Sequence, residues 1–173
     1  MNPESTWLRG ALVVAFVFIV HEGVLRGTRI DGVRPDLLLG LGIVAGIVAG
    51  PERGAMLAFA AALLGDLFVN TPFGLSALVA CVVAFLAGSL QATLRPTQRW
   101  SPPVLAAVGS VVGELMWAAV GTVLGLPGLL HPHLIAIAVV VAVVNAAFAW
   151  PLAILLRWAF PGVTPPTRVT SLV

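Results

Sequence analysis

The sequence predicts an all-α integral membrane protein, a compact bundle of about six transmembrane helices. Of its 173 residues, 60% are hydrophobic and only 9% are charged, whereas a soluble domain carries about 25% charged residues. The mean hydropathy is +1.07. Apolar runs occupy most of the length, and no stretch between them is long enough for a separate water-soluble domain. We therefore expect one multi-span membrane domain over 1–160 and a short cytoplasmic C-terminal tail over 161–173.

Six apolar runs are candidates for the spans. A bilayer core of about 30 Å needs about 20 helical residues. The runs cover 7–25, 36–50, 54–69, 72–94, 103–126 and 133–158. The first is interpreted as a retained span, because His21 and Glu22 follow its apolar core where a signal peptide has small residues. The second and third are short, and we expect a thinned bilayer or cover by neighbouring protein there.

Residues typical of turns and helix ends separate the apolar runs. Residues 50–54, Gly-Pro-Glu-Arg-Gly, predict a tight polar turn. Residues 95–103 form a longer loop that ends in two prolines, and proline favours the first turn of a helix. Leu126-Pro127-Gly128 ends the fifth run, and His131-Pro132-His133 opens the sixth.

The arginines predict the orientation, because cytoplasmic loops of membrane proteins are enriched in Lys and Arg. All nine basic residues are arginines. With the N-terminus inside, the cytoplasmic ends hold Arg9, Arg53, Arg95, Arg99, Arg157 and Arg168, and the outer side holds Arg26, Arg29 and Arg34. Both termini are therefore predicted to be cytoplasmic. Trp7, Trp100 and Trp158 then fall near cytoplasmic boundaries, as interfacial anchors do.

Small residues recur every four positions in several runs. Such residues share one helix face and let two backbones approach closely, which is a main source of helix association in lipid. The stripes are Gly42, Gly46 and Gly50; Gly54, Ala58 and Ala62; Ala80, Ala84, Gly88 and Ala92; and Gly109 and Gly113, then Gly121 and Gly125. We expect helix packing at Gly42, Gly46, Gly50, Gly88 and Gly113. The alternative is that Gly and Ala are simply common in membrane helices.

Asp66 is the first of two acidic residues inside the apolar runs. It lies about one turn from the outer end of the third run, where its carboxylate can reach the interface. Asn70 is suited to end the third helix, Thr71 to cap the next, and Pro72 to occupy its first position. The new helix exposes unpaired amides, which a nearby carboxylate satisfies. We interpret the stretch as a polar clamp on a hairpin of two helices.

Glu114 is the second, near the middle of the fifth run. An ionised carboxylate there costs on the order of 3 kcal/mol on insertion scales. It is therefore protonated, paired with a polar group such as Asn145, or directed into a wet cavity. A structural hydrogen bond between helices is the favoured interpretation.

No catalytic or metal-binding constellation is found. His21-Glu22 and the pair His131 and His133 lack the ligand spacing of a zinc site and are interpreted as markers of helix ends. Cys81 has no second cysteine to pair with. There is no nucleophile elbow and no phosphate-binding glycine loop. Because the arginines are scattered, we also expect no nucleic-acid partner. Since no ligand set or binding loop is present, we expect no metal and no cofactor.

Two stretches resemble the rod shape-determining protein MreD family. One is the string GVRPDLLL, residues 32–39, and the other is ERGAMLAFAAALLGDLFVNTPFGLSALVACVVAFLAGSL, residues 52–90. That family has a Pro-Asp-Leu start to a span, a helix ending in Asp-Leu, and a Pro-x-Gly-Leu hairpin into a further helix. The matching residues are Pro35, Asp36, Gly54, Phe59, Gly65, Asp66, Leu67, Pro72, Gly74 and Leu75. The match covers about a third of the chain.

The resemblance implies a non-enzymatic scaffold of the bacterial cell-elongation machinery in the cytoplasmic (inner) membrane. Its partners would be an MreC-like scaffold protein and, directly or indirectly, a RodA-type glycosyltransferase with its penicillin-binding transpeptidase and MreB filaments. Such a protein maintains cell shape by coupling these partners during peptidoglycan synthesis. The hairpin residues and Pro35-Asp36 are the expected partner-binding or structural residues. Family members are similar in architecture to the membrane substrate-binding components of energy-coupling-factor transporters.

Six spans with both termini inside fit a second function equally well. In this alternative the chain is a vitamin-type transporter component, with Glu114 and Trp117 in an outward-facing pocket. An intramembrane lipid-modifying enzyme is disfavoured, because the sequence offers neither a nucleophile nor a metal-ligand set.

Overall fold

The computed structural model describes residues 3–25, 27, 33, 35–69, 72–94, 100–129 and 133–161. These residues form six α-helices, and a π-helical turn, His21–Leu25, continues the first of them. The α-helices are α1 (Pro3–Val20), α2 (Leu37–Ala49), α3 (Pro51–Asp66), α4 (Leu75–Thr93), α5 (Ser101–Val123) and α6 (His133–Ala159). The described part of the chain is therefore all-helical, in the predicted order.

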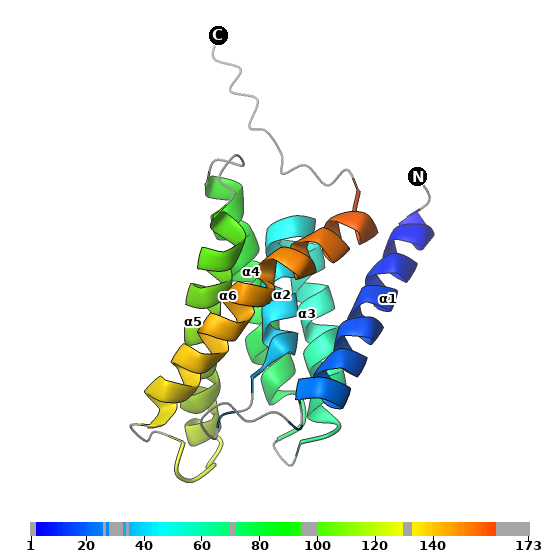
Figure 1. Ribbon diagram of the computed structural model, residues 1–173. Helices are drawn as coiled ribbons and strands as arrows, with labels where there is room; N and C mark the ends of the chain where they lie inside the picture. Colours follow the sequence, from blue (N-terminus) through cyan, green and yellow to red (C-terminus); the bar gives the residue numbers. More distant parts are fainter. Residues whose placement is uncertain are drawn as a thin grey trace.

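The helices run up and down, so that the bundle has two distinct ends (Figure 1). α1 begins and α6 ends at one end, which we call the terminal end. α2 and α4 begin at the other, which we call the capped end. The capped end is the side that the arginine distribution predicts to be outside.

Four of the helices are long and apolar enough to cross a membrane. They cover Ser5–Gly23, Leu75–Thr93, Ser101–Val123 and His133–Ala159. α2 has 13 residues and α3 has 16, or about 20 and 24 Å at 1.5 Å per residue. The expectation of about six transmembrane helices is confirmed only in part: the described chain has six α-helices, of which four have the length and composition of full spans.

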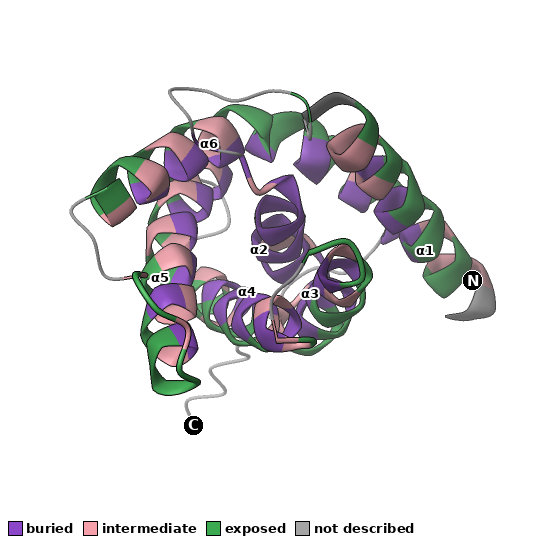
Figure 2. Ribbon diagram, turned by 90° about the horizontal axis from the view of Figure 1, so that it is seen from below, coloured by how far each residue is buried: buried purple, intermediate pink, exposed green. Residues whose placement is uncertain are grey.

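The short helix α2 lies at the centre of the bundle. Figure 2 shows it enclosed by the other helices, and 11 of its 13 residues are buried. A helix that is apolar on all sides is suited to such a position. Because protein rather than lipid surrounds α2, its length does not have to match the thickness of a bilayer.

Glycines let the helices around α2 approach closely. A Cβ atom on Gly46 would meet the carbonyl oxygen of Ala84 in α4, and one on Gly54 of α3 would meet the backbone of Gly46. A Cβ on Gly88 would lie 2.7 Å from the Gly46 carbonyl oxygen. The three backbones therefore meet with no room for a side chain, as the stripes of small residues predict.

The other predicted packing glycines divide into two groups. A Cβ on Gly42 would lie 2.6 Å from the Ala58 Cβ, and one on Gly113 would lie 2.8 Å from Leu39 Cδ2. Gly50, in contrast, has open space around its Cβ position. The prediction of helix packing at Gly50 is wrong, since its positive φ of 90° is what the turn between α2 and α3 requires.

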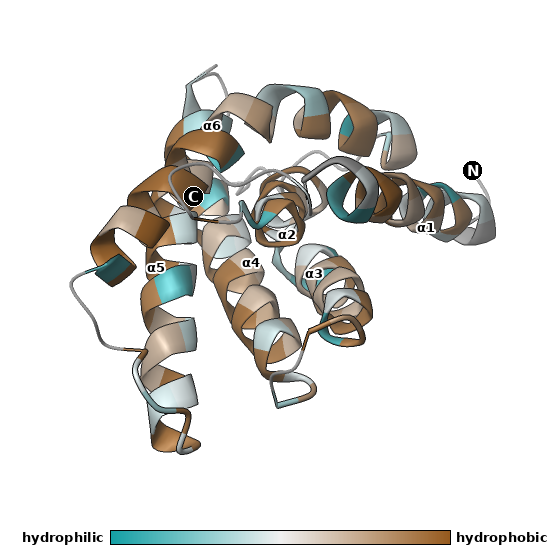
Figure 3. Cartoon of the chain, turned by 60° about the horizontal axis from the view of Figure 1, so that its bottom comes forward, coloured by the Kyte–Doolittle hydropathy of each residue, from teal (hydrophilic) through white to brown (hydrophobic). Residues whose placement is uncertain are grey.

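The outer surface of the bundle is apolar. Large hydrophobic side chains are exposed along α1, α4, α5 and α6, and Figure 3 shows hydrophobic residues along each of these helices. Examples are Leu12, Phe16, Phe85, Val112 and Ile154. Such a surface is typical of helices that face lipid tails.

Candidate functional site

Asp66 joins the end of α3 to the start of α4. Its side chain is only 4% exposed. Its Oδ2 accepts hydrogen bonds from the backbone N–H of Gly74, at 2.9 Å, and of Ala77, at 3.4 Å. The first amides of a helix have no partner within the helix, and a carboxylate is stabilised at that positive end of the helix dipole. The expected hydrogen bonds from Asp66 to the following helix are therefore present.

The details of the hairpin differ from the prediction. α3 ends at Asp66 and α4 begins at Leu75, so Pro72 is not the first helical residue. Its carbonyl instead accepts from the Leu75 N–H at 3.1 Å. Gly74, with a φ of 90°, occupies the N-cap position of α4. Glycine has no side chain to accept a hydrogen bond there, and the Asp66 carboxylate accepts it instead. Asn70 and Thr71 lie outside the described residues.

The expectation that the Asp66 carboxylate reaches the membrane interface is wrong. The carboxylate is buried in the protein and does not extend to an interface. Two backbone amides stabilise it there, which is the usual way in which a buried carboxylate is satisfied.

Asp36 starts α2 in a similar way. Its Oδ1 accepts from the N–H groups of Leu38 and Leu39, both at 3.0 Å, which is the geometry of an N-cap. Pro35, directly before it, is buried. Both stretches that carry the family resemblance are thus helix starts at the capped end.

Asn145 of α6 links three helices in the core. It is fully buried, and its Nδ2 donates to the Asp36 carbonyl at 2.9 Å and to Ser110 Oγ of α5 at 2.8 Å. A Cβ on Gly40 would lie 2.5 Å from Asn145 Oδ1, so a larger residue at that point of α2 would displace the Asn145 side chain. The predicted pairing of Asn145 with Glu114 is wrong, because Nδ2 of Asn145 donates to Asp36 and Ser110 and its buried Oδ1 has no hydrogen-bond partner among the described residues.

Ser110 is a core residue that the sequence analysis did not single out. It is fully buried and lies one helical turn before Glu114. Its position among small residues of α5 resembles ordinary helix packing, and a lone serine in an apolar run carries no signal for a distant partner.

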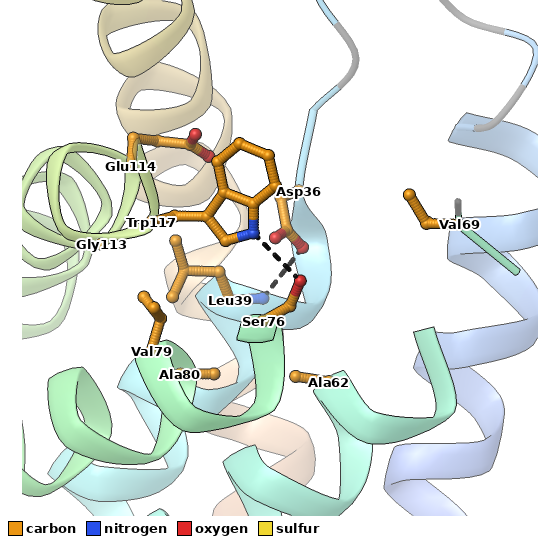
Figure 4. Close-up of a pocket in the computed structure, with 10 residues that line it drawn as sticks. All are labelled: Asp36, Leu39, Ala62, Val69, Ser76, Val79, Ala80, Gly113, Glu114 and Trp117. Carbon is orange, nitrogen blue, oxygen red and sulfur yellow. Dashed lines mark hydrogen bonds between the residues drawn. The ribbon is translucent and has the colours of Figure 1, made fainter. Parts of the chain in front are cut away.

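Glu114 lines a cavity of about 320 Å³ together with Trp117, Asp36 and Ser76. Figure 4 shows these side chains around the cavity, to which α2, α3, α4 and α5 all contribute residues. The Trp117 Nε1–H donates to Ser76 Oγ at 3.3 Å and so connects α5 to the first turn of α4. Three environments were expected for Glu114: a protonated state, a polar partner or a cavity. In the structure its side chain lines a cavity.

A second cavity, of about 230 Å³, adjoins the first. It is lined by His21 and Glu22 of the π-helical turn and by Asp66, and it shares Asp36 and Ser76 with the first cavity. A π-helical turn often marks a functional position in a helix. The polar residues of both cavities thus gather toward the capped end.

Chemically, this region is equipped to bind a ligand by charge and hydrogen bonds. Among the residues that the structure describes, no three His, Cys, Asp or Glu side chains are grouped so that they could hold a metal ion. His133 is exposed at the start of α6. His131 falls outside the described residues. Cys81 is half-buried in α4 as a free thiol.

Comparison with protein-family models, with curated proteins and with solved structures finds no match to the chain. The resemblance to the MreD family therefore rests on the motifs quoted above, and the functional argument rests on the chain's own geometry.

Proposed function

We propose that the chain is a non-enzymatic membrane scaffold of the bacterial cell-elongation machinery, as its resemblance to the MreD family implies. In this function it spans the cytoplasmic membrane with both termini inside. It holds an MreC-like protein at its outer end and through it couples to the peptidoglycan synthases.

The α3–α4 hairpin is the observation that carries the proposal. Asp66 fixes the turn by binding the Gly74 and Ala77 amides, and Asp36 fixes the adjacent start of α2. Asn145 then ties that start to α6 through the Asp36 carbonyl. Hydrogen-bonded caps therefore give the capped end a defined shape, which a docking surface requires.

The turn of this hairpin presents apolar side chains. Leu67, Val69 and Phe73 are exposed, Phe73 at 65%. They lie beyond the helical part of α3 and α4, where the chain turns between the two helices. Exposed apolar groups held on a rigid turn are suited to contact another protein at the membrane surface.

Co-purification with an MreC-like protein tests the proposal. We expect Phe73→Ser to reduce the amount of MreC recovered, because it removes an exposed apolar contact without touching the Asp66 hydrogen bonds. Asp66→Leu should reduce recovery further, because it removes the hydrogen bonds that hold the turn with all three exposed side chains. Phe59→Ser, an exposed position in the middle of α3, is the matched control.

All variants are compared at equal amounts in the membrane. If MreC recovery with Phe73→Ser and Asp66→Leu equals that with the unaltered chain, the hairpin is not the docking surface. Loss with Phe59→Ser to the same extent would indicate a general effect on the protein instead.

A further inference from the structure

We propose that the cavity between α2, α3, α4 and α5 is a binding site for a small organic cation that has an apolar body. The cationic group would lie beside the carboxyl groups of Asp36 and Glu114. The apolar body would pack on Leu39, Val79 and the Trp117 indole. This inference is separate from the scaffold proposal, because it rests on Asp36, Glu114 and Trp117 and not on Phe73, although Val69 of the turn also lines the cavity.

The cavity follows from the lengths of the helices. α5 has 23 residues and α2 has 13, so that α5 is about 15 Å longer. The first turn of α2, with Asp36 as its cap, therefore contributes to the wall of the cavity beside the longer α5. A volume of about 320 Å³ is at the lower end of the range for small-molecule sites.

Glu114 supplies the strongest reason for a cationic ligand. No hydrogen bond or ion pair connects its carboxyl group to another residue within the described ranges. A carboxyl group inside a membrane span normally faces a partner, a water-filled space or a ligand. Since Glu114 lines the cavity, a cation there would give this group a partner that the described protein does not supply.

The charged side chains that line the cavity, among the residues that the structure describes, have one sign. Asp36 and Glu114 both line it, and no arginine among the described residues does so. The described arginines, Arg9, Arg53 and Arg157, belong to the terminal end. The arginines of the first loop lie outside the described residues. An ammonium group would be attracted to these two carboxyl groups in their ionised form, whereas an anionic ligand would be repelled by them.

The apolar part of the wall selects a body of limited size. Leu39, Val79, Ala62 and Ala80 line the cavity with Trp117. An indole attracts a nearby cation through its π face and also packs against apolar groups. Together these features fit a ligand with one ammonium group and a single ring or a short alkyl chain.

The test measures ligand binding to the full chain reconstituted in lipid nanodiscs. The probe is radiolabelled 2-phenylethylammonium, and the comparison compound is 2-phenylethanol, which has nearly the same shape but no charge. We expect saturable binding of the amine and at least tenfold weaker binding of the alcohol. Glu114→Gln should lower the affinity for the amine about tenfold, as the loss of a charge-assisted hydrogen bond would.

Two further variants make the result specific. Trp117→Leu should weaken amine binding several-fold, because it removes the aromatic face. Glu52→Gln is the matched control, since it removes a carboxylate that is exposed in α3 near the terminal end. It should bind the amine as the unaltered chain does.

The inference is overturned if the amine does not bind saturably, if the alcohol binds equally well, or if Glu114→Gln leaves amine binding unchanged. Should Glu114→Gln fail to fold, as judged from circular dichroism, the comparison of amine with alcohol on the unaltered chain decides the question. Phe73→Ser, which tests the scaffold proposal, should bind the amine as the unaltered chain does. Failure of one proposal can therefore be distinguished from failure of the other.

Discussion

Single polar side chains in this protein connect segments that are far apart in the sequence. Asn145 lies 109 residues from Asp36 and 35 from Ser110, and it donates to both. Inside a membrane protein such hydrogen bonds contribute about 0.6 kcal/mol on average and up to about 1.7 kcal/mol. Their role here is to define where α6 and α5 lie against the start of α2.

We expect Asn145→Leu to destabilise the folded chain by about 1–2 kcal/mol, because it removes two interhelical hydrogen bonds. The larger branched side chain would also press on Gly40, which has no room beside residue 145. Unfolding by denaturant in mixed micelles measures the effect. Val143→Leu, at an exposed position of the same helix, is the control, and an equal change in both variants would contradict the role given to Asn145.

At the scale of elements, the glycines of α2 set the distances between helices. Gly46 lies against Ala84 and Gly88 of α4 and against Gly54 of α3, all through backbone atoms. A backbone contact cannot relax by a change of rotamer, so the helices themselves would have to separate to admit a side chain.

Gly46→Ala should therefore destabilise the bundle by about 1–3 kcal/mol, as overpacking does in a dense core. The added methyl group would meet the Ala84 carbonyl oxygen. Gly23→Ala is the matched control, because no described atom beyond its own turn of the chain lies within 4 Å of a Cβ at that position. Thermal unfolding of the two variants in the same lipid measures the difference, and equal midpoints would show that the helices do not meet closely at Gly46.

The hairpin gives a second prediction at this scale. Asp66→Ala should cost about 0.5–2 kcal/mol, the usual effect of losing an N-cap side chain. It should also speed hydrogen exchange at the amides of Gly74 and Ala77, which lose their acceptor. Mass spectrometry of exchanged peptides covers both positions.

Asp66→Asn retains an oxygen acceptor and should change the exchange rates less than Asp66→Ala. The first turn of α2, which Asp36 caps independently, serves as an internal reference. Unchanged exchange at the start of α4 in Asp66→Ala would contradict the capping role.

The whole molecule is organised around α2 and has unlike ends. At the terminal end, Arg9 lies 5.4 Å from the centre of the Trp158 ring and Trp7 packs edge-on against Phe160. These contacts join the start of α1 to the end of α6. At the capped end lie the carboxyl groups of Asp36 and Asp66 and both cavities.

The two ends imply a topology that reporter fusions can test. We expect a cytoplasmic signal from fusions after residues 53 and 98 and an outside signal from a fusion after residue 129. The reason is the excess of arginine on the terminal side. A cytoplasmic signal at 129, or an outside signal at 53, would reverse the orientation.

Much of the helical organisation was predictable from local patterns. The apolar runs anticipate each α-helix within a few residues at most boundaries. The signals at the hairpin were misread, because Pro72 suggested a helix start and Gly74 with Asp66 provides one instead. A cap that comes from a different helix is hard to recognise, because the usual signals assume that it lies within three residues of the helix start.

The cavity was less predictable. Glu114 and Trp117 were candidates for a pocket, because polar groups within an apolar run are often functional. Nothing in the sequence indicated that Ser76 and Asp36 line the same cavity. These four residues come from three helices whose mutual positions depend on close glycine contacts. Sequence spacing within one helix carries no information about such contacts.

The sequence by itself determined the apolar composition, the helices in the described part of the chain and the small residues through which they pack. Those properties depend on apolar content and on spacing within a few turns. Only the tertiary structure decided that the short helix α2 is central, that Asn145 binds Asp36 and Ser110 and not Glu114, and that Glu114 lines a cavity. These depend on how separate helices meet, which follows from backbone distances and helix lengths together.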